Sequence, residues 1–555
     1  MVPFLLLGIL AYAAAQADSS VFRHRFSSEV SPCEDFNEYV CNLKENVDTS
    51  WTDELQNRFM YDLLRHFNDY SDQIVDFVRQ IYARDIIGTE FTHDEWFALN
   101  RRIILSNEAA PYINFVVPKL VRENGLWMPE ETLAELKKVY TAVNEALVES
   151  IQVSMKKEPK HQIMKPLGFT ACSPPYRGFN LCIQYSYAFQ EQHWISQEQL
   201  EHVTNVIKNI EAYIYFPEAA KDPQNINTAL SFFEESFREN LDALEEHILD
   251  SSCDSACLLD HLKSFMLSTL YKYIATYSNS PEYIHYWLIE GAPFAVGAWN
   301  SLGGDGKIAV LPAMSYYMNH TNLPRGLLYS TIAWQLGHEL LHNLDSSKWG
   351  DRGATALRNV SRYESGFHCF ANFYGSFVSS APDGRLLFPN GELKQNEGFC
   401  DVEGFRVALK AVKKLLEIER DAVEVDSEHS DFEWFFLGAG LSYCHRANDY
   451  AQFVFLKDRP HPRFSVRINA VALQTPEFSE VFHCKPGDPI TYKLMAGKQN
   501  NMRTIRNGQL CLSGSGEVAM LAPSTATRTA ACGRSAEREE AAARRRHWFN
   551  YPSLR

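Results

Sequence analysis

Residues 338–342 read His-Glu-Leu-Leu-His, and the apolar, helix-compatible stretch 331–337 leads into them. On a helix, His338 and His342 are four positions apart, so both imidazoles project from one face and can share a metal ion. Glu339 lies beside them, where a carboxylate can take a proton from a water held by the metal without binding the metal itself. The segment therefore predicts half of a mononuclear zinc site together with its general base.

Two further carboxylates can supply the third metal ligand and the hydrogen-bond acceptor for a ligand histidine that this segment lacks. Glu397 and Asp401 are also four residues apart, so a second helix would present both on one face. Glu397 can complete a His₂Glu set of ligands that keeps one position open for water. Asp401 can accept a hydrogen bond from the outer nitrogen of His338, and Asp345 is placed to do the same for His342.

Each of these features also has a plainer interpretation. An H-E-x-x-H pattern can arise by chance in a long chain, and Glu397 and Asp401 could be solvated residues of a surface helix. A structural zinc site is a poor alternative, because such sites are normally closed and rich in cysteine. The combination of two imidazoles, a base, a third ligand and an outer carboxylate favours a catalytic zinc site.

Four separated stretches resemble the neprilysin and endothelin-converting-enzyme family of zinc metallopeptidases. They are Ser31–Cys41, the HELLH segment, Glu397–Asp401, and His461–Arg467 with its continuation Pro476–Cys484. The resemblance is strong at 31–41 and from about Ala292 to Cys484, and only compositional between them. It implies a mainly α (α+β) fold: a thermolysin-like zincin catalytic domain with a small sheet, plus a helical capping domain that admits short peptides.

The resemblance also implies roles for residues whose types alone say little. His461 and Arg467 lie six positions apart in an expected strand or loop. Without the resemblance, both would be interpreted as ordinary surface residues. The family implies that His461 donates to the oxyanion of the tetrahedral intermediate, and that Arg467 holds a substrate carbonyl through its planar fork.

One substrate-binding segment departs from the family pattern. An Asn-Ala-aromatic motif usually precedes H-E-x-x-H, and the matching stretch here is Gly297-Ala298-Trp299. Ala298 keeps its expected place in the substrate cleft. The asparagine amide that binds peptide backbone is missing, unless Asn300 replaces it. Leu311-Pro312-Ala313 resembles the segment that lines the cleft. The change leaves zinc binding intact but puts peptide affinity and selectivity in question.

Composition agrees with a folded extracellular enzyme. The 555 residues can hold two or more domains, and hydrophobic and charged fractions of 45% and 22% are ordinary for globular proteins. The net charge of −16 argues against nucleic acid as a partner. The apolar N-terminal run and Ala15-Gln16-Ala17 predict a signal peptide over residues 1–17 rather than a membrane anchor. Asn319 and Asn359 lie in glycosylation sequons.

Twelve cysteines without a four-cysteine zinc pattern indicate disulfides formed in an oxidising compartment. The sequence alone leaves the pairing open, with two local candidates, Cys172–Cys182 and Cys253–Cys257. The family resemblance implies two bonds of very long span, Cys33–Cys484 and Cys41–Cys444. It also implies that Cys369 pairs with a cysteine near the C-terminus, for which the candidates are Cys511 and Cys532.

Resemblance and patterning together predict the order of domains. After the signal peptide, residues 18–50 are expected to be tied to the catalytic domain, 51–280 to form the helical capping domain, and 281–494 to form the catalytic domain. Residues 495–555 lack apolar periodicity and are expected to be disordered or aberrant. Helical spacing in the capping region predicts helices over Leu55–Val78, Pro129–Met155, Ser196–Tyr215 and Asn227–Leu249.

These observations predict a secreted, zinc-dependent endopeptidase that hydrolyses short peptides. It would hold one Zn²⁺ per chain through His338, His342 and Glu397. The rival hypothesis is a secreted family member with weak or no activity that binds peptides or proteins, favoured by Gly297 and the divergent C-terminal stretch. The complete set of ligands, base and oxyanion donor favours the peptidase, because a chain released from catalysis has no physical need to keep them.

Overall fold

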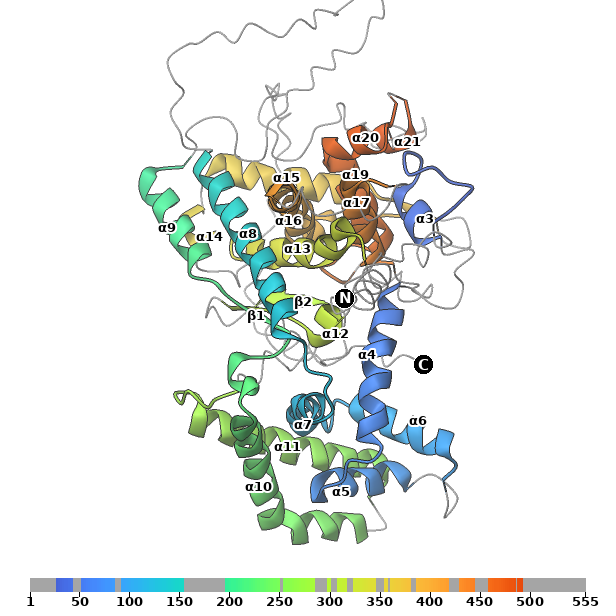
Figure 1. Ribbon diagram of the computed structural model, residues 1–555, viewed down its shortest axis with the longest axis vertical. Coiled ribbons are helices and arrows are strands. Elements are labelled where there is room, and N and C mark those ends of the chain that lie inside the picture. The colour runs from blue at the N-terminus through green and yellow to red at the C-terminus, as the bar shows by residue number, and fades with distance from the viewer. Residues whose placement is uncertain are drawn as a thin grey trace, which may run out of the picture.

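Most of the described chain is helical, with two small sheets (Figure 1). The computed structural model describes residues 26–42, 51–84, 91–153, 195–249, 253–284, 297–300, 307–316, 323–345, 354–357, 360–380, 386–418, 429–444, 458–485 and 487–492. The predicted fold class, mainly α with a small sheet, is confirmed. Among the described helices, none combines the length and apolar character needed to cross a bilayer.

The N-terminal half of the chain supplies one strand among its helices. In chain order these elements are α3 (Phe36–Cys41), α4 (Trp51–Phe67), α5 (Gln73–Ala83), α6 (His93–Ile104), α7 (Ala110–Glu123), α8 (Glu130–Val153), α9 (Gln197–Lys208), β1 (Glu211–Ile214), the 3₁₀ helix η1 (Glu218–Lys221), α10 (Pro223–Leu249) and α11 (Ser255–Tyr277).

The C-terminal half supplies the remaining strands and the helices that hold the predicted site. They are β2 (Ala298–Asn300), β3 (Lys307–Val310), α12 (Pro312–Tyr316), α13 (Arg325–Leu341), α14 (Ala354–Leu357), α15 (Ser361–Gly375), β4 (Ser379–Ser380), β5 (Leu386–Leu387), α16 (Gly391–Ile418), α17 (Asp431–Leu441), α19 (Phe464–Gln474), α20 (Pro476–Val481) and α21 (Pro489–Tyr492).

The helices gather into two lobes (Figure 1). One lobe is built around α13, which packs against α16 and α17, with α15 on the other side of α16. The second lobe contains α5, α6, α7, α10 and α11, and α4 runs from one lobe to the other. The predicted metal-binding residues all lie in the first lobe.

A three-stranded sheet in the order β1-β3-β2 lies beside α13. β1 is parallel to β3, and β2 is antiparallel to it and forms an edge. β1 belongs to the expected capping region 51–280, yet it pairs with a strand of the expected catalytic region 281–494. α8, also from 51–280, packs against α13 and α16. The capping region therefore contributes directly to the lobe that holds the site.

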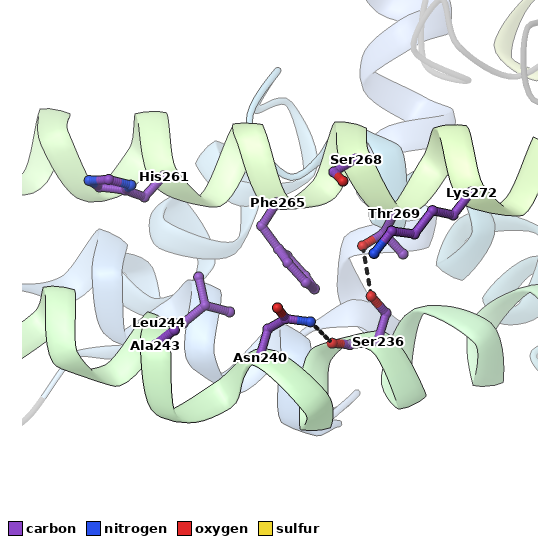
Figure 2. Close-up of a pocket in the computed structure, with 9 residues that line it drawn as sticks. All are labelled: Ser236, Asn240, Ala243, Leu244, His261, Phe265, Ser268, Thr269 and Lys272. Atoms are coloured by element: carbon purple, nitrogen blue, oxygen red, sulfur yellow. Dashed lines mark hydrogen bonds between the residues drawn. The ribbon is translucent and has the colours of Figure 1, made fainter.

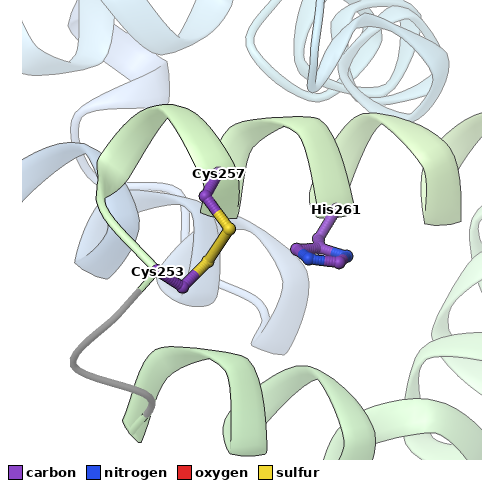
Figure 3. A group of neighbouring side chains, drawn as sticks. All are labelled: Cys253, Cys257 and His261. Carbon is purple, nitrogen blue, oxygen red and sulfur yellow. A yellow bond between two sulfur atoms is a disulfide. The ribbon is translucent and has the colours of Figure 1, made fainter.

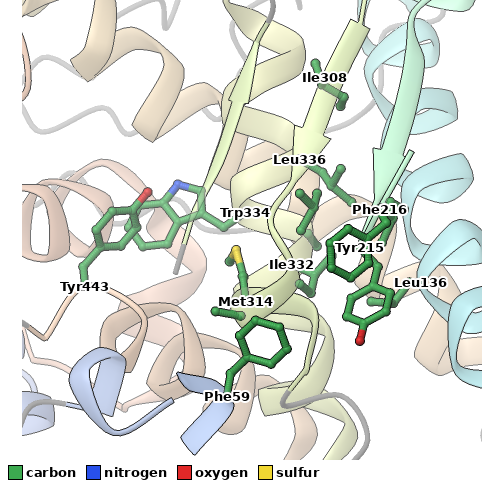
Figure 4. Packing of buried hydrophobic residues seen from close by; sticks show 14 of the residues in the cluster. Phe59, Leu136, Tyr215, Phe216, Ile308, Met314, Ile332, Trp334, Leu336 and Tyr443 are labelled. Carbon is green, nitrogen blue, oxygen red and sulfur yellow. The ribbon is translucent and has the colours of Figure 1, made fainter. Parts of the chain in front are cut away.

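The buried face of α13 meets side chains from distant parts of the chain (Figure 4). Trp334 packs edge-on against Tyr443, with 4.5 Å between ring centroids. Ile332 and Leu336 point towards the sheet and towards Leu136 of α8. Burying this apolar surface fixes α13 in place, and with it the histidines at its end.

The stretch 55–78 forms two helices rather than the single one that its periodicity predicted. Asp72 caps the second helix, because its Oδ1 accepts the Val75 N–H at 2.7 Å. The buried guanidinium of Arg79 donates to the carbonyl of Phe67 at 2.8 Å, which satisfies the end of the first helix. The Asp72 cap and the buried Arg79 guanidinium thus separate two helices, although the apolar spacing alone predicts one continuous helix.

The stretch 196–215 also departs from prediction at its end. α9 ends at Lys208, and residues 211–214 form β1 by pairing with 307–310. The partner strand lies far along the chain, so local spacing could not reveal it. The helices predicted over 129–155 and 227–249 are present as α8 and α10.

Two disulfides tie the N-terminal segment to the lobe that holds the site. Cys33 is bonded to Cys484, and Cys41 at the end of α3 is bonded to Cys444 just after α17. These are the pairs that the family resemblance implied. α3 also packs on α19, where the Asn469 side chain accepts the backbone N–H of Asn37 at 2.9 Å. The segment is therefore held by covalent and non-covalent contacts together.

Candidate metal centre

The two predicted histidine ligands lie at the end of α13. Nearly the whole helix is buried, including His338 at 2% exposure, and His342 follows as its C-cap. His342 keeps helical backbone angles, and its N–H donates to the carbonyl of His338 at 3.3 Å. Both side chains therefore leave the same face, with their Nε2 atoms 3.1 Å apart.

α16 crosses α13 next to His338 in backbone-to-backbone contact. A Cβ placed on Gly337 would lie 2.4 Å from the carbonyl oxygen of Gly404, and one placed on Gly404 would lie 2.6 Å from the amide nitrogen of His338. Real Cβ atoms do not approach other atoms so closely, so either side chain would push the helices apart. The glycine pair thus sets the distance from which Glu397, two turns earlier on α16, reaches the histidines.

Glu397 completes a triangle of candidate ligand atoms. Its Oε2 lies 3.3 Å from Nε2 of His338 and 3.6 Å from Nε2 of His342. Ligand atoms at the usual zinc bond lengths, about 2.0–2.1 Å in a tetrahedron, stand about 3.3 Å from one another. The observed triangle therefore has the size of a zinc ligand set. Glu397 Oε2 is also buried without a well-directed hydrogen bond from any described residue, which is a costly position for a negative oxygen unless a cation is present.

The outer nitrogens of both histidines face carboxylates at the positions that the sequence suggested. His338 Nδ1 lies 3.0 Å from Oδ1 of Asp401, and His342 Nδ1 lies 2.8 Å from Oδ2 of Asp345. A carboxylate at the outer nitrogen fixes the tautomer, so the Nε2 lone pair faces the other ligands. The buried free thiol of Cys400 adds a contact to His342 Nδ1 at 3.5 Å, which sequence reasoning did not identify.

Asp401 is completely buried and has a second partner. Nε and Nη2 of Arg467 donate to its two carboxylate oxygens at 2.8 and 2.6 Å, and Nη2 also donates to the Tyr443 hydroxyl at 3.0 Å. Burial alone would raise the pKa of Asp401, but the charge of Arg467 outweighs burial and holds that pKa below its ordinary value. The carboxylate is therefore charged, and it can orient the imidazole of His338.

Arg467 differs from its prediction in secondary structure, and it has a protein partner that the sequence did not indicate. It lies on α19 rather than in a strand or loop, and its planar fork grips Asp401. The helix was not predicted because the segment before Phe464 is irregular, and the same irregular structure was expected to continue to Arg467. Among the described residues, no hydrogen bond from Nη1 of Arg467 is seen, and the side chain as a whole is buried.

His461 reaches the same centre from the segment before α19. Its Nε2 lies 3.0 Å from Oε2 of Glu397, and its ring stacks on that of His338 with 6.4 Å between centroids. The His461 side chain is 43% exposed, whereas that of His338 is 3% exposed. The structure thus brings His461 to the ligand atoms while leaving it open to solvent.

Glu339 lies beside the ligands with 5% exposure. A carboxylate oxygen of Glu339 and one ring nitrogen each of His338 and His342 lie within 4.8 Å of one another. Burial raises the pKa of the Glu339 carboxyl group above its ordinary value. A raised pKa suits a group that must take up a proton and release it near neutral pH.

The edge strand β2 is attached to the same helix. Nδ2 of Asn300 donates to the backbone carbonyl of Glu339 at 2.9 Å. This bond uses one N–H of the Asn300 amide, which leaves its second N–H and its Oδ1 as the groups that could replace the asparagine absent at Gly297. Ala298 lies on the edge strand β2, opposite Val310 of β3.

A cavity and a group of two cysteines with a histidine lie at α10 and α11, away from the metal centre. The cavity has a volume of about 230 Å³. Figure 2 shows Ser236, His261 and Lys272 among its lining residues. Figure 3 shows Cys253 and Cys257 near the same His261. The two sulfurs form a disulfide, one of the local pairs considered from the sequence, so neither offers a thiolate ligand. Neither feature includes a residue of the metal centre.

Some predicted features lie outside the described residues. They are the signal peptide over 1–17, the sequons at Asn319 and Asn359, the pair Cys172–Cys182 and the stretch 495–555. Cys369 is disulfide-bonded, and its partner also lies outside the described ranges.

The region around the metal centre matches known peptidases. The model of peptidase family M13 matches residues 308–496. Neprilysin-1 of Caenorhabditis elegans is 28% identical over 177 residues, and Neprilysin-3 of Drosophila melanogaster is 25% identical over 182 residues. The part of the chain that holds the metal centre is therefore similar to peptidase family M13. Each alignment covers 30% of this chain, and they cover 23% and 22% of the two relatives, so less than a quarter of their length is matched.

Solved structures similar to this chain include the Mycobacterium tuberculosis zinc metalloprotease Zmp1 in complex with an inhibitor. The TM-score is 0.47 at 14% sequence identity, over 74% of this chain and 51% of that chain. PepO from Lactobacillus rhamnosis HN001 has a TM-score of 0.41 at 14% identity, over 74% of this chain and 52% of that chain.

Proposed function

We propose that this chain is an extracellular, zinc-dependent endopeptidase that cleaves short peptides. The observation that carries the proposal is the triangle formed by His338, His342 and Glu397, whose ligand atoms stand 3.1–3.6 Å apart. This spacing of three electron-rich atoms fits one shared Zn²⁺ ion. When bound, Zn²⁺ supplies Lewis acidity that lowers the pKa of a water molecule and polarises the scissile carbonyl.

Glu339 is the proposed general base. It lies next to the ligands in sequence and in space, and burial raises its pKa. It takes a proton from the attacking water and then delivers that proton to the leaving amine. The carboxylate can do both steps because it is not one of the three atoms of the ligand triangle.

His461 is the proposed donor to the oxyanion that forms on the substrate. Its partial exposure and its 3.0 Å approach to Glu397 support an imidazole at the open side of the ligand set. Arg467 is proposed to orient the substrate through Nη1, because Nε and Nη2 are used by Asp401 and Tyr443. Asp401 contacts both His338 and Arg467, so it fixes the proposed metal ligand and the proposed substrate-binding residue relative to each other.

The edge strand β2 is proposed to bind the backbone of the peptide. Within the described sheet, β2 has a strand neighbour on one side only. An extended peptide can add to such an edge through main-chain hydrogen bonds. The bond from Asn300 to Glu339 holds this edge beside the helix that carries the general base.

The experiment is to incubate the purified protein with a mixed library of short peptides, with and without a zinc chelator, and to detect cleavage by mass spectrometry. Cleavage should be abolished by the chelator and restored by Zn²⁺. Glu339→Gln should keep its zinc and its melting temperature but lose about 10²–10⁴-fold in kcat. Glu392→Gln, an exposed residue at the start of α16, is the matched control and should retain full activity. Full activity of Glu339→Gln would refute the assigned base.

A peptide-binding protein with weak or no activity is the second candidate, and one observation favours it. Gly297 stands where the family has an asparagine, and the nearby amide of Asn300 on β2 is bonded to the Glu339 carbonyl through one of its N–H groups. Retention of library peptides by a zinc-loaded, folded protein that cleaves none of them would support this candidate over the peptidase.

A further inference from the structure

Lys394 is a lysine buried on the helix that also carries Glu397 and Asp401. It lies on α16 one turn before Glu397, and 2% of its surface is exposed. Lysine is among the residues least often found fully buried, because its ammonium group must keep hydrogen-bond acceptors when it leaves water. Its acceptors therefore indicate what the residue does.

Two backbone carbonyls of the segment before α19 accept from this ammonium group. Nζ donates to the carbonyl of Arg459 at 2.8 Å and, over a longer 3.5 Å, to the carbonyl of His461. The two carbonyls flank Pro460 in the chain. The contact is thus made with the main chain of His461, the residue whose imidazole reaches the metal centre.

The segment has few other means of attachment through its main chain. Pro460 and Pro462 lack an N–H, so most of the hydrogen-bonding groups that the backbone around His461 offers are carbonyls. The His461 side chain is 43% exposed, so its own burial fixes it less firmly than that of His338. A buried group with several hydrogen-bond donors can hold the carbonyls of such a backbone in place, and an ammonium group has three donors.

Lys394, Glu397 and Asp401 form one stripe along α16. Their spacing of three and four residues places them on the same face of the helix. Each contacts a different part of the segment 459–467: Lys394 contacts its main chain, Glu397 the His461 ring, and Asp401 the Arg467 guanidinium. One rigid helix face therefore sets the position of both proposed substrate-contacting residues.

We infer that Lys394 is a positioning residue for His461: by binding the carbonyls of residues 459 and 461, it holds the imidazole where the oxyanion forms. The inference rests on the proposed peptidase function. The contacts from Lys394 to the main chain of residues 459 and 461 give its effect a route through His461.

The electrostatic surroundings of Lys394 agree with this role. Burial, assisted by the charge of Arg463 and opposed by Asp458, lowers the pKa of Lys394 to about 8. The amine is therefore still mainly protonated at neutral pH and can use all three of its donors.

The test is a double-mutant cycle with Lys394→Met and His461→Ala. Lys394→Met should lower kcat by about tenfold or more while KM and bound zinc stay within about twofold. In the His461→Ala background the same change should have almost no further effect, because the residue that Lys394 positions is gone. Lys413→Met, an exposed lysine on the same helix, should keep the activity of the unmodified protein.

An equal loss of kcat in both backgrounds would overturn the inference, and so would an unchanged kcat in Lys394→Met. Hydrogen–deuterium exchange supplies a measurement that does not need activity. In Lys394→Met, exchange should rise in a peptide covering 458–465 and stay constant in 325–341. If the unmodified protein cleaves nothing but exchange rises in this way, the proposed function fails and the anchoring of the segment stands. Unchanged exchange would refute the anchoring in an active or an inactive protein.

Discussion

Gly337 and Gly404 bring the two site-bearing helices into direct backbone contact, one residue away from the buried imidazole of His338. The carbonyl oxygen of Gly404 lies only 2.4 Å from the place where a Cβ of residue 337 would be. The ligand triangle depends on this closeness, because Glu397 and the histidines come from opposite sides of the crossing.

Gly404→Ala should therefore weaken both the fold and zinc binding. The added methyl group would meet the backbone of His338 at 2.6 Å, and separating the helices should cost about 1–3 kcal/mol of unfolding free energy. Urea unfolding and a zinc titration measure the two effects. Gly375→Ala is the control, since its Cβ would have no neighbour closer than 3.8 Å and should leave both quantities unchanged. Normal zinc affinity in Gly404→Ala would show that the crossing does not set the ligand spacing.

Gly297→Asn should improve peptide binding. A Cβ at this position has nothing within 4 Å, so the structure offers room for the larger side chain. A restored amide contact to the peptide backbone should lower KM by about tenfold, the equivalent of one good hydrogen bond, with little change in kcat. Steady-state kinetics on a peptide found in the library screen would measure this. Gly297→Ala separates the amide from the mere presence of a side chain, and an equal effect of both substitutions would contradict the prediction.

Arg467→Met should be strongly destabilising. It would leave the fully buried Asp401 carboxylate without its bidentate partner, and breaking a buried ion pair in this way costs about 3–5 kcal/mol. Chemical unfolding monitored by tryptophan fluorescence is a suitable measurement. The exposed Arg101 of α6 provides the comparison, because Arg101→Met should change stability by less than about 0.5 kcal/mol. A small effect at both positions would mean that Asp401 finds another partner.

The buried charge of Lys394 predicts a pH dependence of stability. The pKa of this amine is about 8 in the folded protein and 10.5 for an unperturbed lysine. Between these values the unfolded chain binds more protons than the folded one, so this residue makes the unfolding free energy rise with pH across that window. The total effect is about 3 kcal/mol, present above pH 10.5 and lost as the pH falls through 8.

Comparing Lys394→Met with the unmodified protein isolates this contribution, because other titrating groups are common to both. The stability advantage of the methionine variant should be largest near neutral pH and should shrink as the pH rises towards 10. A constant difference would indicate that Lys394 has an ordinary pKa in the folded protein. If Lys394→Met is more stable than the unmodified protein and also loses kcat, the lysine serves to position His461 and does not stabilise the fold.

The spacing of residues within single helices predicted much of the centre. The four-residue intervals of His338–His342 and Glu397–Asp401 are sufficient to place each pair on one face, and the structure has both pairs on helices. Local spacing could not show that α13 and α16 meet at two glycines, because the crossing depends on packing between distant segments. The contact from Lys394 to residues 459 and 461 was missed for the same reason. Arg467 was placed in a strand or loop because the irregular, proline-containing stretch around His461 hides the helix that begins at Phe464.

The disulfide from Cys33 to Cys484 spans 451 residues, and the one from Cys41 to Cys444 spans 403. During synthesis the first thiol of each pair emerges long before its partner exists. Chains fold from the N-terminus as they are made, so these early cysteines must remain reduced or form temporary bonds with other thiols. Closure of the lobe that holds the metal centre is therefore a late event in biogenesis, and the yield of correctly bonded protein should depend on thiol–disulfide exchange after translation is nearly complete.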